Sequence, residues 1–279
     1  MKISTIRLIT FSPTGGSDKI GEEVADEIAS SLQKAGNKLI VEIISLTRQH
    51  VENIEPLVPQ VETLYICAVP VYSGRVAKDA MARIKALQLA TNSQAACTPV
   101  IPIAVYGNRD YEDALVELYD YFESIGFLSI AAGAFIGEHS YSNAQVPLAA
   151  GRPDAKDQTK ICSFGQQVAQ LIIETSSEHP FASVKSILKG NRPYREGTKI
   201  ATTAPIADPK RCINCGKCVE VCPTGAISKP FDINVAACIQ CCACVKVCPE
   251  DARFFETPIR DFLNENCKSR REPEMFFAG

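Results

Sequence analysis

The chain has 279 residues, a length that suggests about two domains. Hydrophobic residues make up 46% and charged residues 22%, a composition typical of globular protein rather than of disordered chain. The net charge of −3 argues against bulk electrostatic binding to nucleic acid or to an anionic membrane. No apolar run approaches the roughly 20 residues of a membrane-spanning helix, and the N-terminus lacks the pattern of a signal peptide. We therefore expect a cytoplasmic protein with no nucleic-acid partner and no membrane span.

The first 175 residues alternate between two hydrophobic periodicities. Short runs rich in Ile, Val and Leu are typical of strands buried on both faces of a parallel sheet. These runs are Ile6–Phe11, Leu39–Leu46, Leu64–Val69, Val100–Val105 and Leu128–Phe135. Helical patterns lie between them, as where Ile20, Val24, Ile28 and Leu32 recur every four residues. The alternation predicts a doubly wound α/β domain, to which we assign residues 1–188.

The character of the sequence changes after Leu188. Residues 189–208 carry prolines, glycines and charges without an apolar period, so we interpret them as a linker. Residues 209–257 form a cysteine-rich module, and residues 258–279 form a tail. Within the tail we expect a short helix at Pro258–Asn264 and a charged stretch, Lys268–Glu274, that frays.

Cysteine is the most informative residue of the chain. Nine of the 13 cysteines lie between Cys212 and Cys248. A disulfide framework would spread its cysteines through the fold, whereas this clustering indicates metal binding. The pattern C-I-x-C-x-x-C-V-x-V-C-P occurs twice, beginning at Cys212 and again at Cys238.

Each copy has the spacing C-x2-C-x2-C-x3-C-P, in which three cysteines bind one 4Fe–4S cube and the fourth reaches the other cube. The first predicted ligand set is Cys212, Cys215, Cys218 and Cys248, and the second is Cys238, Cys241, Cys244 and Cys222. Structural zinc is the alternative, but zinc is typically held by two C-x2-C pairs, which fits these runs poorly. Cys242 falls on a spacer position, and we interpret it as a free thiol.

A glycine-rich loop follows the first predicted strand. Its sequence, Phe11-Ser-Pro-Thr-Gly-Gly-Ser17, lets backbone N–H groups converge on an anion at a helix N-terminus. The loop matches neither dinucleotide nor nucleoside-triphosphate patterns, and its hydroxyls suit a single terminal phosphate. An ordinary N-capped turn is the alternative interpretation.

Two further loops end at the same edge of the predicted sheet. The third strand leads into Pro70–Arg75 and the fourth into Tyr106–Tyr111. Tyr72 and Tyr106 could flank a flat ring, or each could merely cover the sheet edge. Three such loops at one carboxyl edge favour a ligand.

The loop Ser12–Ser17 resembles the S/T-x-T-G-x-S/T phosphate loop of flavodoxins, and the cysteine module resembles a bacterial two-cluster 4Fe–4S ferredoxin. The whole chain is similar to the flavodoxin–ferredoxin fusion proteins of anaerobic prokaryotes. This resemblance implies a five-stranded sheet of order 2-1-3-4-5 that binds FMN, and a small α+β ferredoxin-like domain. The phosphate would be held by Ser12, Thr14, Gly15, Gly16 and Ser17. The isoalloxazine ring would be held by Tyr72, Ser73, Gly74, Arg75, Tyr106, Gly107 and Asn108.

The sequence departs from that family in its charges near the flavin. Arg75 and Arg109 lie in the flavin loops, and His139 and Arg152 follow the last strand. We hypothesise that these cations stabilise reduced anionic flavin or bind an anionic substrate. The polar stretch Ser140–Asp157 would be a flap near the flavin.

These features predict a carrier that passes electrons between FMN and two 4Fe–4S clusters and exchanges them with redox protein partners. One alternative is a flavin-dependent reductase of a quinone, a nitroaromatic or another flavin, which would need an open pocket over the ring. A second alternative is a regulatory module that signals through loss of its clusters.

Overall fold

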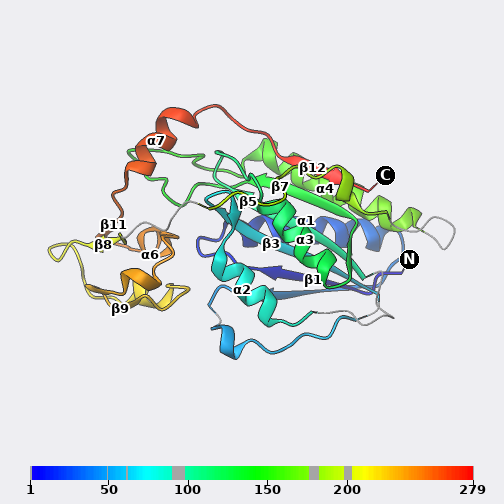
Figure 1. Cartoon of the computed structure of the whole chain (residues 1–279), viewed down its shortest axis with the longest axis horizontal. Helices are drawn as coiled ribbons and strands as arrows, with labels where there is room; N and C mark the ends of the chain where they lie inside the picture. Colours follow the sequence, from blue (N-terminus) through cyan, green and yellow to red (C-terminus); the bar gives the residue numbers. More distant parts are fainter. Residues whose placement is uncertain are drawn as a thin grey trace.

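The computed structural model describes residues 2–48, 50–60, 62–89, 98–175, 182–197 and 203–278. Its central sheet contains five long strands in parallel: β1 (Thr5–Thr10), β2 (Ile40–Ser45), β3 (Thr63–Tyr72), β5 (Thr98–Tyr106) and β7 (Ala131–Ile136). Their order is β2-β1-β3-β5-β7, which is the flavodoxin-like order 2-1-3-4-5 (Figure 1). The predicted α/β fold is therefore confirmed. Two short strands, β4 (Arg75–Val76) and β6 (Phe127–Ser129), pair with β3 and β5.

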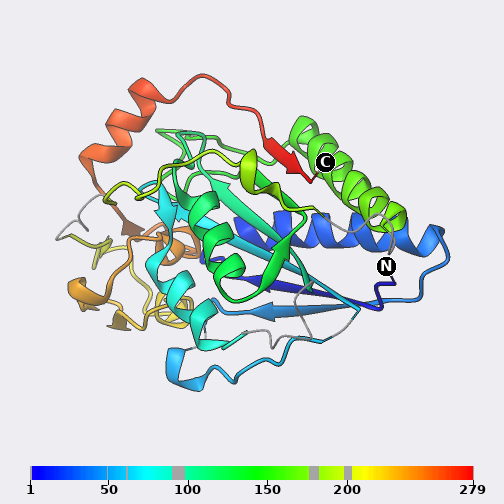
Figure 2. The same cartoon turned by 45° about the vertical axis from the view of Figure 1, so that its right-hand side comes forward.

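Helices cover both faces of the sheet (Figure 2). α1 (Gly16–Lys34) and α4 (Ala155–Glu174) bury their apolar stripes on one face, where Val24 and Phe164 join one core cluster. α2 (Lys78–Ala86) and α3 (Ala114–Ser124) cover the other face with residues such as Ile84 and Phe122. Two single-turn helices, Val51–Asn53 and Val184–Ser186, lie in connecting segments. In the described parts of the chain, no helix is both long enough and apolar enough to span a membrane.

A strand from the C-terminal tail also extends the sheet beyond the five predicted strands. β12 (Glu274–Phe277) pairs antiparallel with β7 at the sheet edge, with Glu274 opposite Ala134. The charged stretch before it is held by ion pairs, such as that from Arg270 to Asp154 at 2.6 Å. The expectation that Lys268–Glu274 frays is therefore wrong.

The cysteine-rich module is a small α+β unit, as predicted. Two antiparallel pairs frame it: β8 (Ile206–Ala207) with β11 (Arg253–Phe254), and β9 (Ile227–Lys229) with β10 (Asp232–Ile233). The short helices α5 (Lys217–Glu220) and α6 (Ala243–Lys246) each carry the third cysteine of one repeat, and a single turn spans Val235–Ala237. The predicted helix in the tail is confirmed as α7 (Pro258–Asn266).

The module lies beyond the carboxyl ends of the parallel strands and is tied to the sheet domain on both sides (Figures 1 and 2). Before the module, residues 189–197 contact the N-terminal end of α3. There the Asn191 and Arg195 amides donate to the carboxylate of Asp113, the N-cap residue of that helix, at 2.7 Å each. After the module, α7 leads the tail back to β12. The module therefore cannot swing freely on a single linker.

Candidate metal and cofactor site

Nine cysteines line two separate cavities of the module. One cavity is bordered by Cys212, Cys215, Cys218 and Cys248. The other is bordered by the four predicted ligands Cys222, Cys238, Cys241 and Cys244, and also by Cys242. The fourth cysteine of each repeat thus faces the other repeat's cavity, which is the crossed arrangement that the spacing predicts. Within the described residues, no three Cys, His, Asp or Glu side chains lie close enough to hold a single metal ion.

The crossed arrangement depends on left-handed backbone at matched positions of the two repeats. Asn214 and Gln240 have φ of 55° and 54°, and Gly216 and Cys242 have φ of 76° and 57°. These residues wrap each loop around its cavity before a short helix begins. Cys242 thus occupies the glycine position of the repeat, although left-handed backbone is unfavourable for a side chain. It is 2% exposed and lies beside the second cavity.

The surroundings of the sulfur atoms fit a cationic iron–sulfur group. Backbone N–H groups of Ala226 and Ala252 donate to the sulfurs of Cys222 and Cys248 at 3.2 Å. Such bonds stabilise thiolate ligands. Burial raises the pKa of the Cys241 and Cys244 thiols to about 12. These buried groups would become thiolates only beside a strong positive charge, which bound iron supplies.

One buried arginine connects the module to the phosphate loop. Arg83, on α2, is 3% exposed and donates to the carbonyl oxygens of Leu46, Thr47 and Pro223 at 2.8, 2.7 and 2.5 Å. Thr47 in turn accepts from the Ser12 amide at 2.8 Å through its hydroxyl. Pro223 directly follows Cys222 in the chain. The guanidinium therefore fixes a ligand loop of the module against the phosphate loop.

The predicted ring loop also contacts the second cysteine repeat. Tyr72 is half-buried, and Ile239 of the repeat packs against the same core cluster of the sheet domain. Burial, together with the nearby thiols of Cys241 and Cys242, raises the pKa of Tyr72 well above its usual value. The second cavity therefore lies beside the loop that follows β3.

The polar loop after β7 contacts the module from the other side. Lys246 pairs with Glu138 at 2.6 Å and donates to the Ser142 carbonyl at 2.8 Å. The Tyr141 ring packs edge-on against Phe255 with centroids 5.4 Å apart. This loop, predicted as a flap, is thus part of the surface on which the module docks.

The phosphate loop forms an open cradle at the N-terminus of α1. Gly15 has φ of 83°, and a Cβ at Gly15 or Gly16 would meet no atom within 4 Å. The Ser12 hydroxyl accepts from the Asp18 amide at 3.0 Å, which caps the helix. Among the described residues, no backbone carbonyl accepts from the amides of Gly16 and Ser17. Free amides at a helix N-terminus fit a phosphate group.

The two glycines of the ring loops are points of close approach. A Cβ on Gly74 would lie 1.8 Å from the Glu112 carboxylate, and one on Gly107 would lie 2.3 Å from the His139 ring. Ser73, between Tyr72 and Gly74, is exposed with φ of 54°. Tyr106 is buried and packs against Tyr111 with ring centroids 5.6 Å apart. The ring loops therefore meet at one edge and are lined by His139, which the sequence analysis named, and by Glu112, which it did not.

Both arginines assigned to the flavin loops have carboxylate partners. Arg75 binds Glu117 through two N–H groups at 2.9 and 2.8 Å and stacks on Tyr194 at 4.7 Å. Arg109 binds Glu112 at 2.7 Å. Much of their charge is thus compensated locally, which weakens the hypothesis that they act on the flavin.

Asn108 connects the loop after β5, Tyr106–Tyr111, to the C-terminal tail. Its amide nitrogen donates to the carbonyls of Cys267 and Ser269 at 2.8 and 3.0 Å. Its oxygen accepts from the Arg271 amide at 2.9 Å and from Arg152 at 3.0 Å. All the hydrogen-bonding capacity of this side chain is used to hold residues 267–271 over the loop.

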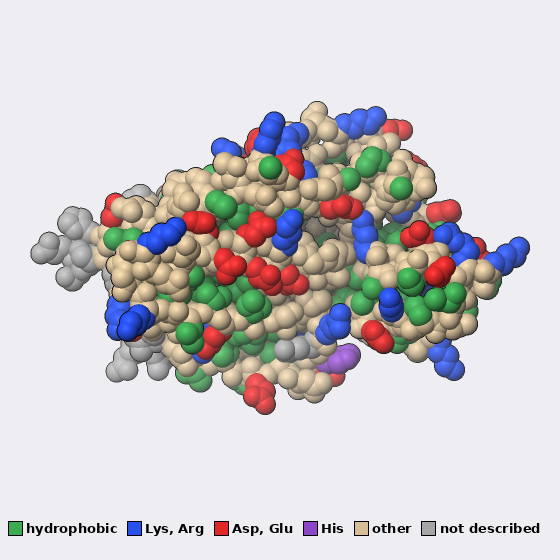
Figure 3. Space-filling view, turned by 180° about the vertical axis from the view of Figure 1, so that it is seen from behind, with side chains coloured by type: hydrophobic (Ala, Val, Ile, Leu, Met, Phe, Trp, Pro, Cys, Tyr) green, Lys and Arg blue, Asp and Glu red, His purple; other side chains and the backbone are tan. Residues whose placement is uncertain are grey.

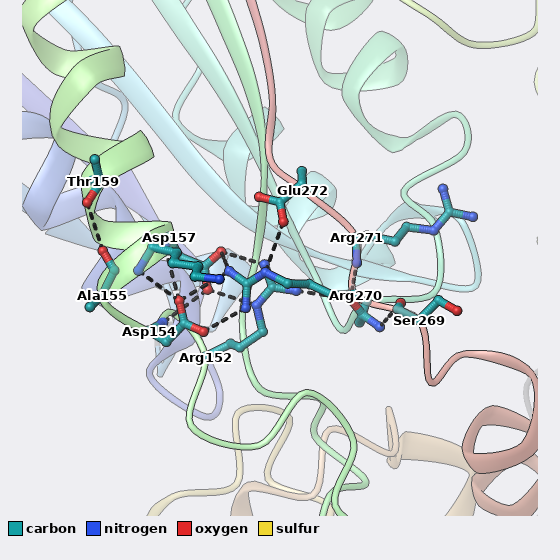
Figure 4. A network of polar contacts seen from close by, with 11 residues as sticks. Arg152, Asp154, Ala155, Asp157, Thr159, Ser269, Arg270, Arg271 and Glu272 are labelled. Carbon is teal, nitrogen blue, oxygen red and sulfur yellow. Dashed lines mark hydrogen bonds and ion pairs between the residues drawn. The ribbon is translucent and has the colours of Figure 1, made fainter.

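A network of charges surrounds this junction (Figure 4). Arg152 and Arg270 both bind Asp157, and Arg270 also binds Asp154, the N-cap residue of α4. Arg270 lowers the pKa of the Asp154 carboxyl far below its usual range. Beside the network lies a cavity of about 200 Å³, bordered by Asn108, Leu148, Leu263 and Lys268 among others.

Sequence reasoning missed Arg83 and Ile239 as parts of the site. The sequence did contain a signal for Arg83, because its charge lies on the same helical face as the apolar residues Ala80 and Leu87. The structure buries both of those residues. Ile239 gave no such signal, because its counterpart Ile213 has the same residue type in the same motif.

Comparisons with known proteins agree with the cysteine geometry. Residues 205–228 and residues 238–252 each match a 4Fe–4S binding domain. Among curated proteins, no sequence relative matches the chain.

Solved structures similar to the sheet domain include flavodoxins. One, from the domain Archaea, has 11% identity and a TM-score of 0.42 over 61% of this chain and 99% of its own. The flavodoxin of Streptococcus pneumonia TIGR4 has 17% identity and a TM-score of 0.40 over 60% and 99%. Flavodoxin 1 of Bacillus cereus has 16% identity and a TM-score of 0.39 over 62% and 100%. The strand order itself carries the fold assignment: the chain joins a sheet domain of flavodoxin-like order to a region similar to 4Fe–4S binding domains.

Proposed function

We propose that the chain is an electron-transfer protein in which one FMN and two 4Fe–4S clusters exchange electrons within a single polypeptide. The observation that carries the proposal is the docking of the second cysteine set at the edge that bears the phosphate loop. Arg83 joins the two through Thr47 and Pro223. Bound FMN would supply a carrier of one or two electrons, and each cluster a carrier of one.

Different residues of the chain would bind the phosphate, the ring and the two clusters. The amides of Gly16 and Ser17 would bind the phosphate, with Ser12, Thr14 and Gly15 shaping the loop. Tyr72, Ser73 and Gly74 would border the ring from one side, and Tyr106, Gly107 and Asn108 from the other. The two crossed cysteine sets would each bind one cluster. The electron donor and acceptor would be redox proteins.

One observation favours a second candidate, the reduction of a small molecule. The cavity of about 200 Å³ borders Gly107 and Asn108, and so lies beside a predicted ring loop. A reductase would show saturable turnover of a quinone or nitroaromatic substrate. Blocking the cavity with Leu263→Trp would then reduce that turnover, whereas a pure carrier would show neither effect.

Anaerobic purification with counts of iron, sulfide and flavin tests the main proposal. We expect about eight iron, about eight sulfide and one FMN per chain. Zinc in place of iron would contradict the cluster assignment. Iron without flavin would leave the sheet domain as a scaffold for partners.

A further inference from the structure

The two twelve-residue cysteine repeats are identical at eight positions but have opposite surroundings. Ile213, the second residue of the first repeat, is 60% exposed. Its counterpart Ile239 packs against the core cluster of the sheet domain. Cys215 is exposed, whereas its counterpart Cys241 is 8% exposed.

The difference continues along the repeats. Lys217 is exposed, and the matching Ala243 is 3% exposed. Glu220 and the matching Lys246 are both exposed, but Lys246 binds Glu138 of the sheet domain. Docking thus turns one repeat toward the sheet edge and leaves the other facing solvent.

We propose that these surroundings give the two clusters different tasks. The set Cys222, Cys238, Cys241 and Cys244 is the inner site, which exchanges electrons with the flavin. The set Cys212, Cys215, Cys218 and Cys248 is the outer site, where electrons enter and leave the chain. The assignment rests on the proposed function and adds the route that electrons take.

Contacts between the sheet domain and the residues around the inner site hold that site against the sheet edge. Tyr72 and Tyr141, from the loops after β3 and β7, lie beside the second repeat, and burial there, with the cysteine thiols nearby, raises the pKa of both phenols. Pro223, which follows the inner ligand Cys222, is bonded to Arg83. An external protein cannot reach this side without displacing the sheet domain.

The outer side offers an accessible surface. The module forms the lobe at the right-hand end of Figure 3, where basic and acidic side chains are interspersed with hydrophobic ones. Ile206 and Ile213 are 55% and 60% exposed there, and Ala207 and Ile213 border the outer cavity. A reduced one-electron carrier protein that contacts this lobe would lose one electron to the outer site. The same electron would pass to the inner site and then to the flavin, so that two such transfers supply two electrons.

Differential labelling of cysteines in the anaerobic holoprotein tests the assignment. Free thiols are first blocked with unlabelled iodoacetamide, and an iron chelator is then added with isotope-labelled iodoacetamide. Peptide mass spectrometry follows each cysteine over time. We expect Cys212, Cys215, Cys218 and Cys248 to acquire the heavy label at least ten times faster than the other four, together with release of the first half of the iron.

Equal labelling of both sets, or faster labelling of the inner set, would overturn the assignment while leaving the proposed function intact. Absence of iron or flavin at the start would instead refute the proposed function, and the assignment with it. Fast labelling of Cys222 in place of Cys248 would show that the ligands are not crossed, which also overturns the assignment.

Two matched variants, Ile239→Glu and Ile213→Glu, change the same position of each repeat. Ile239→Glu should abolish the protection of the inner set, because it places a charge against the sheet domain's core. Ile213→Glu should leave that protection unchanged and slow reduction by a bacterial ferredoxin several-fold. The reverse pattern would overturn the assignment.

Discussion

The Nη2 group of Arg83 donates a hydrogen bond to the carbonyl oxygen of Pro223 at 2.5 Å. Through this contact a buried side chain of the sheet domain holds the residue after Cys222, a predicted cluster ligand. The same guanidinium binds two carbonyls in the segment after β2 and lies over the Phe11 ring at 5.1 Å. Arg83 is thus a buried polar link between the two halves of the candidate site.

Replacing Arg83 by alanine should destabilise the holoprotein. Three buried carbonyls would lose their donor, and we expect the free energy of unfolding to fall by about 3 kcal/mol. Urea unfolding under anaerobic conditions measures this change. Arg48→Ala, which removes an exposed arginine from a nearby loop, is the control and should have little effect. Equal stability of the two variants would show that Arg83 does not link the domains.

A negative charge in the phosphate loop should weaken FMN binding. Gly16→Asp adds a side chain where there is open space, so repulsion of the phosphate rather than a steric clash causes the effect. We expect the dissociation constant for FMN to rise about 10- to 100-fold. Fluorescence titration measures it, with Gln33→Asp at the far end of α1 as the matched control. Riboflavin, which lacks the phosphate, should bind both variants alike, and equal weakening of riboflavin would count against a phosphate site here.

The tail should detach when Asn108 can no longer donate. Asn108→Asp tolerates the positive φ of 67° but removes the donors to Cys267 and Ser269. We expect a loss of about 2 kcal/mol, confined to local opening of the tail. Hydrogen exchange of residues 267–273 should become several-fold faster, with β1 unchanged. Unaltered exchange in the tail would show that Asn108 does not hold it.

Stability should depend on pH through His139. Burial, with Arg109 and Lys246 nearby, lowers the pKa of its imidazole from 6.5 to about 4. Its Nδ1 accepts from the Tyr141 amide at 3.0 Å, a bond that protonation would break. The unfolded chain takes up this proton below pH 6.5 and the folded chain only below about 4, so stability falls as the pH drops through that window.

We expect His139 to contribute a loss of about 2 kcal/mol between pH 8 and pH 5. His139→Gln should remove this part of the pH dependence, and His50→Gln, at an exposed histidine, should not. Urea unfolding at several pH values measures the slopes. Identical slopes for the wild type and His139→Gln would mean that this ring is not kept neutral by the fold.

Local patterns predicted most of the fold because each strand and helix carries its own periodicity. The run Val100–Val105 lies within β5, and the crossed cysteine sets follow from spacing alone. β12 could not be predicted in this way. Its short apolar run, Met275–Phe277, follows a charged stretch and becomes a strand only by pairing with β7, more than 130 residues earlier in the chain.

Long-range partners also explain where the site departed from expectation. Arg75 was assigned to the flavin because its neighbours Tyr72 and Gly74 lie in a loop predicted to border the ring. Its partner Glu117 lies on α3, 42 residues later, and the chain direction at β4 turns the guanidinium toward that helix. The asymmetry of the two repeats was hidden for the same reason, since only docking distinguishes Ile213 from Ile239.

The most direct test of the central claim is the kinetics of electron exchange between flavin and clusters after a laser flash. The flavin of the anaerobic holoprotein is reduced by a photochemical donor, and cluster absorbance is followed at several protein concentrations. The account predicts first-order cluster reduction with a rate constant independent of protein concentration, and a much slower rate in Ile239→Glu than in Ile213→Glu. A rate proportional to protein concentration would show that the electrons move between separate molecules, and would contradict the account.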